Sequence, residues 1–290
     1  MRPIPAIAAA ALLAAACSPS PSRIERHADF PSAHVAPRHV DVYLPAGFDA
    51  SGKTRYPVLY MHDGQNLFST ETSYGGVEWR IDEVMDSLGL KAIVVGVWNT
   101  AARFHEYVPQ RPLERHLSAE GQELVRTRLT DPPQSDAYLR FLVTELKPFI
   151  DLSYPTKPDR EATFIMGSSM GGLISLYAAT EYPEVFGGAG MVSTHWPLLI
   201  DRDSEVFMDA MLGYLDGALP VDVAPKLYFD HGTLNLDARY GPHQLRMDSL
   251  MRAKGWPEDR WMSRVFEGTD HNEASWQARV HIPLRFLLGE

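Results

Sequence analysis

The segment TFIMGSSMGG, residues 163–172, contains the serine most suited to chemistry. Gly167, Ser169 and Gly171 match the pattern G-x-S-x-G, which exposes a serine hydroxyl at a sharp turn between a strand and a helix. Glycines suit such a turn because a Cβ there would collide with the crossing strand or helix. A purely structural turn of small residues is the alternative. The strand-like run before the motif and the helix-like run after it predict that Ser169 is a nucleophile and Ser168 a supporting residue.

A nucleophilic serine needs a base, and the base needs an acid that orients it. The expected order along the chain is serine, acid, histidine. His271, in VFEGTDHNEASW, follows the last strand-like run and is the predicted base, whereas a surface histidine beside a helix cap is the alternative. Asp230 ends the strand-like run KLYFD and Asp237 lies in the segment HGTLNLDARY that follows it. Their spacing alone does not separate them as candidates for the acid.

Two backbone amides could stabilise the negative charge that develops on a carbonyl oxygen. Met170 follows the nucleophile, and Gln65 lies in YMHDGQNLF, where Gly64 lets the backbone approach a substrate. His62 and Asp63 in the same segment resemble part of a metal site, but no further cluster has metal-ligand spacing. The sequence therefore predicts an oxyanion hole formed by Gln65 and Met170, no metal and no cofactor.

Aromatic and polar residues near the predicted strand ends are candidates for a substrate pocket. Tryptophan and tyrosine stack well on sugar rings or aromatic acyl groups, and packing in the core or at the rim is the alternative for each. The candidates are Trp79, Trp98, Asn99, Arg103, Glu106, Tyr107, His195 and Trp196. Tyr74, Trp256 and Trp261 are expected to be structural.

The elements that position these residues alternate between strands and helices. Apolar, β-branched runs begin at residues 39, 56, 91, 162, 188, 226 and 261, and helical patterns lie at 78–89, 135–151, 171–183, 204–216, 242–255 and 272–288. Such alternation is typical of an α/β protein with a mostly parallel sheet and helices on both faces. The runs RIERHADF and HVDVYL have no helix between them, which favours antiparallel edge strands.

Residues 99–134 interrupt this rhythm with a polar segment punctuated by prolines. An interval of that length on a sheet is more often functional than a plain connection, so we predict a flap there. No internal repeat or mid-chain linker is evident, and a chain of 290 residues with 45% hydrophobic residues can form one large core. We therefore expect a single hydrolase domain over residues 35–290.

The charge of the chain argues against one class of partner. The formal net charge is −10 and no cluster of lysine and arginine is present. Because binding to nucleic acid needs concentrated positive charge, nucleic acid is not an expected partner.

The N-terminal segment MRPIPAIAAAALLAAAC is typical of an export signal, since an arginine precedes a short apolar run. Cys17 is the only cysteine, and the segment resembles a bacterial lipoprotein signal, although Ala14 stands where leucine is usual. Plain secretion with cleavage near Ala16 is the alternative. We expect a signal peptide over residues 1–16, a tether and arm over 17–34, and a lipid anchor on Cys17 that holds the protein in the periplasm or at the outer membrane.

Several segments together resemble the esterase-D-like, or enterochelin-esterase-like, family of α/β hydrolases. They are PVLYMHDGQNLF, TSYGGVEWRIDE, IVVGVWNT, MGSSMGGLISLYAATEYPEVFGGAG, YFDHGTLNLDARY and GTDHNEASW, and the resemblance covers about residues 35–288. It implies an α/β-hydrolase fold, with Ser169 as nucleophile, His271 as base and Asp237 as acid. It also implies that Gln65 and Met170 supply the oxyanion amides.

The sequence thus favours an exported serine esterase that forms an acyl-enzyme. The expected substrate is a small-molecule or carbohydrate ester, of the carbohydrate acyl or siderophore type. Transfer of an acyl group to a sugar or lipid acceptor is the first alternative, because it would use the same residues. A non-catalytic binding protein on the same fold is the second, and the joint presence of Ser169, Asp237 and His271 argues against it.

Overall fold

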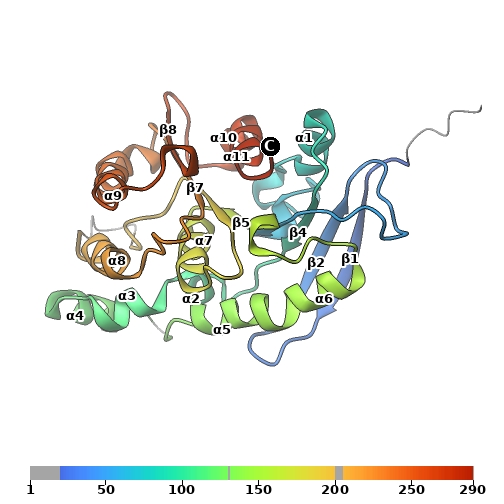
Figure 1. Ribbon diagram of the computed structural model, residues 1–290. Coiled ribbons are helices and arrows are strands. Elements are labelled where there is room, and N and C mark those ends of the chain that lie inside the picture. The colour runs from blue at the N-terminus through green and yellow to red at the C-terminus, as the bar shows by residue number, and fades with distance from the viewer. Residues whose placement is uncertain (1–19, 130, 200–204, 290) are drawn as a thin grey trace, which may run out of the picture.

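Eight strands form one sheet in the order β1-β2-β4-β3-β5-β6-β7-β8 (Figure 1). This computed structural model describes residues 20–129, 131–199 and 205–289. The strands are β1 Arg23–Phe30, β2 Arg38–Leu44, β3 Val58–His62, β4 Ile93–Val97, β5 Thr163–Ser168, β6 Gly188–Val192, β7 Lys226–Gly232 and β8 Trp261–Phe266. β2 pairs antiparallel with both β1 and β4, and the strands from β4 to β8 in the sheet order are parallel. The predicted α/β class and antiparallel edge are confirmed.

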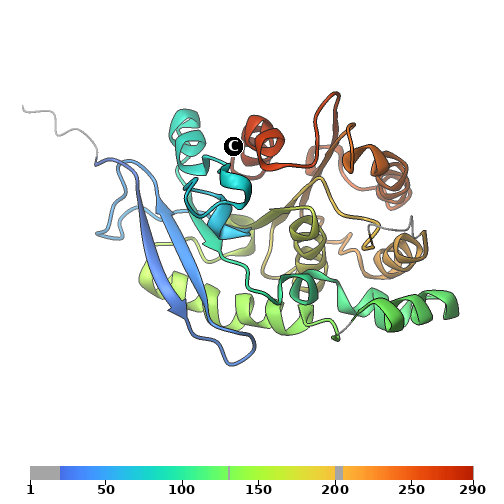
Figure 2. The ribbon, with the colours of Figure 1, turned by 180° about the vertical axis from the view of Figure 1, so that it is seen from behind.

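Helices cover both faces of this sheet (Figure 2). One face is covered by α1 Ile81–Leu88, α10 Glu273–Arg279 and α11 His281–Leu288. The remaining helices lie on the side of the other face. They are α2 Arg103–Tyr107, α3 Gln110–Arg115, α4 Ala119–Arg128, α5 Ser135–Phe141, α6 Lys147–Ser153, α7 Met170–Glu181, α8 Glu205–Ala218 and α9 Gly241–Ala253. Every helical pattern predicted from the sequence coincides with one of these helices or with a consecutive pair.

Side chains that point alternately to the two faces of the sheet divide the core into two layers. In β3, Val58 and Tyr60 pack on the α7 side, whereas Leu59 and Met61 pack on the α11 side. Successive side chains of a strand point to opposite faces, so a strand that is buried on both sides must be apolar at every position. This explains the uninterrupted apolar runs of the sequence.

The interval at residues 99–134 is mostly helical. It contains α2, α3 and α4; α2 packs against α5 and α7, and α3 and α4 lie along α8. Only its beginning reaches the cavity described below. The predicted signal peptide and Cys17 lie outside the described residues, and no helix within those residues is long and apolar enough to cross a membrane.

The sheet brings six loops to one edge. The parallel strands β3, β4, β5, β6, β7 and β8 all end there, and ligands of open α/β sheets bind beyond these carboxyl ends. The candidate residues of the sequence follow these strand ends, so the topology explains how distant segments meet.

Candidate active site

Ser169 occupies a strained turn between β5 and α7. Its backbone angles are φ 57° and ψ −122°, a region that residues with a side chain seldom adopt. Gly167 of the motif is required by close approach, because a Cβ there would lie 2.8 Å from the carbonyl carbon of Gly171. The strand–turn–helix context predicted for G-x-S-x-G is therefore present, and the turn displays the hydroxyl at the edge of the sheet.

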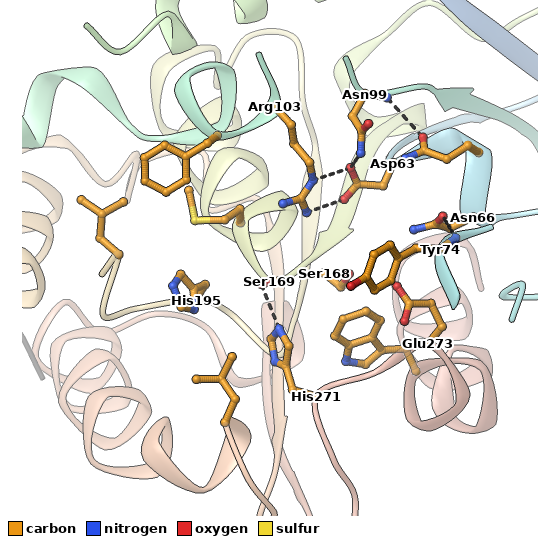
Figure 3. A pocket seen from close by; sticks show the side chains of 16 residues that line it. Asp63, Asn66, Tyr74, Asn99, Arg103, Ser168, Ser169, His195, His271 and Glu273 are labelled. Atoms are coloured by element: carbon orange, nitrogen blue, oxygen red, sulfur yellow. Dashed lines mark hydrogen bonds and ion pairs between the residues drawn. The ribbon is translucent and has the colours of Figure 1, made fainter. Parts of the chain in front are cut away.

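His271 links the serine to a carboxylate. Its Nε2 lies 2.9 Å from Ser169 Oγ (Figure 3). Its Nδ1 lies 2.6 Å from Asp237 Oδ1. Asn272 caps α10 by accepting a hydrogen bond from the Ser275 amide at 2.9 Å. The imidazole is thereby held just before the first turn of that helix. The structure brings together Ser169, His271 and Asp237.

Asp237 is fully buried and its two carboxylate oxygens have separate partners. Oδ1 faces His271, while Oδ2 accepts hydrogen bonds from Ser193 Oγ at 2.6 Å and from the Gly232 amide at 2.7 Å. Burial alone would raise the pKa of Asp237, but these hydrogen bonds outweigh burial and place the pKa below its ordinary value. The carboxylate is therefore ionised at neutral pH.

Asp230, the other candidate for the acid, has no contact with His271 among its hydrogen bonds. It is buried at the end of β7, where it accepts hydrogen bonds from the Ser193 amide at 3.1 Å and from Tyr228 Oη at 2.8 Å. Arg279 donates to it at 3.1 and 3.3 Å. The Gly232 amide at the end of this strand donates to Asp237 and not to Asp230.

The residues predicted for an oxyanion hole both line the cavity. Met170 is the first residue of α7, so its amide belongs to the helix N-terminus, whose amides lack intrahelical acceptors. Gln65 lies in the turn after β3, where Asp63 has φ 57°. A Cβ on Gly64 would lie 2.4 Å from the carbonyl carbon of Gly96, so only glycine lets this turn pack against β4.

A cavity of about 580 Å³ opens above these residues (Figure 3). Its apolar lining includes Met170, Phe104, Leu198 and Leu236, and its polar and aromatic lining includes Asp63, Gln65, Asn66, Tyr74, Asn99, Arg103, His195, Glu273 and Trp276. Ser169 and His271 also line the cavity, and Figure 3 shows the hydrogen bond between them. The cavity is large enough for an organic ester, and it offers both apolar and hydrogen-bonding walls.

A charged pair fixes one wall of the cavity. Arg103 donates two hydrogen bonds of 2.7 Å to Asp63, and Asn99 Nδ2 donates another of 2.7 Å to the same carboxylate. Burial would raise the pKa of Asp63, but Arg103 and Asn99 hold it below its ordinary value. The guanidinium is therefore a rigid group beside the oxyanion turn.

Two histidines near the site are buried and neutral. Burial lowers the pKa of His62 and of His195 to about 3 in each case. His62 Nδ1 lies 2.9 Å from Tyr138 Oη and His195 Nδ1 lies 2.6 Å from Tyr240 Oη. Among the described residues there is no group of three or more potential metal ligands. His195 lines the cavity, as predicted, whereas His62 lies beneath it.

Five predicted pocket residues lie elsewhere. Tyr107 and Trp196 are fully buried, and Trp79 packs against Trp276 with ring centroids 5.6 Å apart. Trp98 turns away from the cavity, donating to Asp41 at 2.8 Å. These predictions are wrong because proximity to a strand end does not fix the direction of a side chain, and large aromatic rings favour burial. Glu106 is likewise buried, in an ion pair with Arg38.

Several lining residues were not predicted from the sequence, among them Tyr74, Glu273 and Trp276. Tyr74, which was expected to be structural, is 78% exposed at the cavity. Glu273 and Trp276 come from the first turn of α10, beside His271. Burial raises the pKa of the Glu273 carboxyl. The cap at Asn272 was the available signal, because it placed the first turn of the following helix near the base.

The strand order, the strained turn and the loops at the carboxyl edge define an α/β-hydrolase fold. Solved structures share it. A ferulic acid esterase is 20% identical, with a TM-score of 0.64, over 92% of this chain and 98% of its own. The enterobactin esterase FES from Shigella flexneri is 18% identical, with a TM-score of 0.61, over 94% of this chain and 60% of its own. FphF, a fluorophosphonate-binding serine hydrolase from Staphylococcus aureus, is 16% identical, with a TM-score of 0.65, over 93% of this chain and 100% of its own.

Residues 33–284 match the model of the family described as "Putative esterase", so the chain belongs to this family of enzymes acting on ester bonds. Among curated proteins it is similar to the ferri-bacillibactin esterase BesA of Bacillus subtilis (strain 168), with 28% identity over 49% of each chain. The uncharacterized protein YjcH of the same organism is 27% identical over 53% of this chain and 54% of its own. The chain spans about half the length of the curated relatives it matches.

Proposed function

We propose that this protein is a serine esterase that hydrolyses a carboxylic ester through an acyl-enzyme. The observation that supports this most is the continuous series of hydrogen bonds from Ser169 through His271 to Asp237, which begins at the wall of the cavity. In this proposal Ser169 is the nucleophile, His271 the general base and acid, and Asp237 the residue that orients the imidazole.

The reaction proceeds in two halves. Ser169 Oγ attacks the ester carbonyl carbon while its proton moves to His271 Nε2, and the amides of Gln65 and Met170 donate hydrogen bonds to the resulting oxyanion. The tetrahedral intermediate then releases the alcohol, which takes the proton from Nε2. Water attacks the acyl-enzyme, passes its proton to Nε2, and the proton returns to Ser169 as the acid leaves.

Asp237 serves both halves without changing its charge. Its carboxylate accepts the hydrogen bond from Nδ1, so Nε2 is left free to take the serine proton, and its negative charge stabilises the imidazolium that forms. The lowered pKa of Asp237 supports this role, because it keeps the carboxylate ionised across the neutral range.

The substrate we propose is a carbohydrate acyl ester or a siderophore-type ester. Tyr74 and Trp276 offer aromatic surface on which a sugar ring or an aromatic acyl group could stack. Arg103 and Asn99 offer hydrogen-bond donors on the neighbouring wall. A ferulic acid esterase and siderophore esterases among the similar proteins also support this class.

The test is labelling and turnover by the purified mature protein. A fluorophosphonate should label Ser169, and p-nitrophenyl esters, feruloylated or acetylated sugars and trilactone siderophores should be screened as substrates. Ser169→Ala should fold normally and lower kcat by about 10⁴–10⁶-fold. Near-normal turnover by that variant, or labelling at Ser168, would contradict the assignment.

We also propose export and anchoring through a lipid on Cys17, which lies outside the described residues. The signal-like segment and the following SPSPS tether support this proposal. Metabolic labelling with a clickable fatty acid should mark the wild-type protein and leave Cys17→Ser unmarked. An unlabelled wild-type protein that is free in the periplasm or medium would indicate ordinary secretion.

A further inference from the structure

Ser193, the first residue after β6, lies at the centre of a buried group of polar side chains behind His271. It is fully buried and its backbone has φ 44°, in the left-handed region. Its Oγ lies 2.6 Å from Asp237 Oδ2, 2.9 Å from Trp276 Nε1 and 2.7 Å from Arg279 Nη2. The hydroxyl therefore has three hydrogen-bond partners, which is as many as a serine can have.

The chemistry of the partners fixes the direction of each hydrogen bond. An indole N–H and a guanidinium can only donate, so Trp276 and Arg279 occupy both acceptor positions of the Ser193 oxygen. The one hydrogen of the hydroxyl is then left for Asp237 Oδ2. Ser193 is obliged to donate to the carboxylate that faces His271.

We propose that Ser193 is a positioning residue of the esterase: it holds the Asp237 carboxylate so that Oδ1 faces the imidazole of His271. This role rests on the proposed function. Oδ2 receives hydrogen bonds from Ser193 and from the Gly232 amide, and together they prevent rotation of the carboxylate. A carboxylate that could rotate would orient His271 less well for accepting the proton of Ser169.

Arg279 should limit the loss of activity that follows when the Ser193 hydroxyl is removed. It donates to Asp230 and to Ser193, and its Nη2 lies 3.7 Å from Asp237 Oδ2. If the serine hydroxyl is removed, this guanidinium can move onto Asp237 and restore part of the lost interaction. The loss of activity should therefore be partial, unlike the loss expected when Asp237 itself is changed.

The first variant to test is Ser193→Gly, because glycine adopts φ 44° without strain and removes only the hydroxymethyl group. Its kcat, per active site titrated with a fluorophosphonate, should fall about 10-fold to 100-fold, since a hydrogen bond to a charged group is lost. KM should stay within about twofold because Ser193 does not line the cavity. Ser193→Ala should reproduce the fall in kcat, which excludes an effect of glycine flexibility.

The matched control is Thr194→Val, which removes the neighbouring buried hydroxyl. Within the described residues, Thr194 Oγ1 has no hydrogen-bond partner. The control should keep the wild-type kcat. A second readout is the proton NMR signal of the hydrogen bond between His271 and Asp237, which should shift in Ser193→Gly and remain in place in Thr194→Val.

The outcomes separate the two proposals. Wild-type protein that neither hydrolyses esters nor reacts with a fluorophosphonate at Ser169 overturns the esterase proposal and this role with it. Wild-type protein that does both, together with Ser193 variants that keep kcat and the proton signal, overturns the role of Ser193 alone. A lower melting temperature with an unchanged kcat per titrated site would mean that Ser193 is only structural.

Discussion

Replacing each of two buried aspartates by asparagine should separate orientation of the base from stability of the fold. In Asp237→Asn, the amide oxygen should occupy the Oδ2 position, because the Gly232 amide and the Ser193 hydroxyl both donate there. The NH₂ group then faces His271 Nδ1 and can only donate to it. Nδ1 must become the acceptor, so the proton resides on Nε2 and the ring cannot accept a proton from Ser169.

We therefore expect Asp237→Asn to lower kcat by about 10²–10⁴-fold, since the wrong tautomer is imposed on the base. The unfolding free energy should change little, because the amide oxygen still accepts from Gly232 and Ser193. The assay is ester turnover per folded molecule together with the thermal midpoint, and His271→Ala is the reference for a lost base.

Asp230→Asn should give the opposite result. Its two oxygens accept hydrogen bonds from Ser193 N, Tyr228 Oη and two nitrogens of Arg279, and one amide oxygen cannot replace both. Removing one partner of a buried ion pair costs roughly 3–5 kcal/mol, which corresponds to roughly 10 °C in the thermal midpoint. The effect on kcat should be below about tenfold, because Asp230 does not contact His271.

A loss of activity in Asp230→Asn as large as that in His271→Ala, with Asp237→Asn still active, would refute the assignment of Asp237 as the acid. If neither variant lost activity, the enzyme would work with Ser169 and His271 alone.

Three further predictions concern the backbone and the pH dependence. Gly64→Ala should lower kcat by about 10-fold or more, because its Cβ would lie 2.4 Å from the backbone of β4 and must displace the oxyanion turn; kinetics on a p-nitrophenyl ester would measure this. In Gly217→Ala, in α8, the added Cβ would have no neighbour within 4 Å, so the unfolding free energy should rise by roughly 0.5–1 kcal/mol in urea denaturation. This variant is the control for Gly64→Ala, and a loss of activity as large as that of Gly64→Ala would contradict the role of the close contact at Gly64. Burial lowers the pKa of His62 and His195 to about 3, so between about pH 6.5 and pH 3 these two histidines bind protons in the unfolded chain but not in the folded one. Their contribution to the unfolding free energy should be fully present above about pH 6.5 and should fall towards pH 3, by up to about 1.4 kcal/mol per pH unit for each histidine. His62→Asn should reduce this slope when the unfolding free energy is measured by denaturation at several pH values.

The elements and the positions of Ser169 and His271 could be predicted because local patterns determine them. A strand that is buried on both faces needs a run of apolar residues, and β3 has one at residues 58–61 and β5 at 164–166. Gly167 is required because a Cβ there would meet the backbone of Gly171 within the same turn. His271 is fixed between the end of β8 and the cap of α10. In each case the signal lies within about ten residues of the site.

The choice between Asp230 and Asp237 depends on longer-range geometry. After β7 the chain turns so that the amides of Thr233 and Leu234 donate to the Thr269 carbonyl, each at 3.0 Å. This contact brings the segment containing Asp237 beside the loop of His271. Spacing along one strand contains no information about that contact, so the residues alone left the two aspartates equal and only the family resemblance favoured Asp237.

The residues that line the cavity are the part of the site that the sequence predicted least well. Strand ends alone did not identify them, whereas the helix cap at Asn272 indicates where Trp276 lies. Trp79 and Trp196 lie near strand ends, but their rings turn into the core, where their apolar area is buried. Trp276 lies four residues after the cap at Asn272, so one helical turn returns it to the side of the base. Its ring lies 5.0 Å from that of His271, and its indole N–H reaches Ser193. Trp276 thus lines the cavity and also orders the buried polar group behind the base. Its position depends on the cap of α10 and not on the end of a strand.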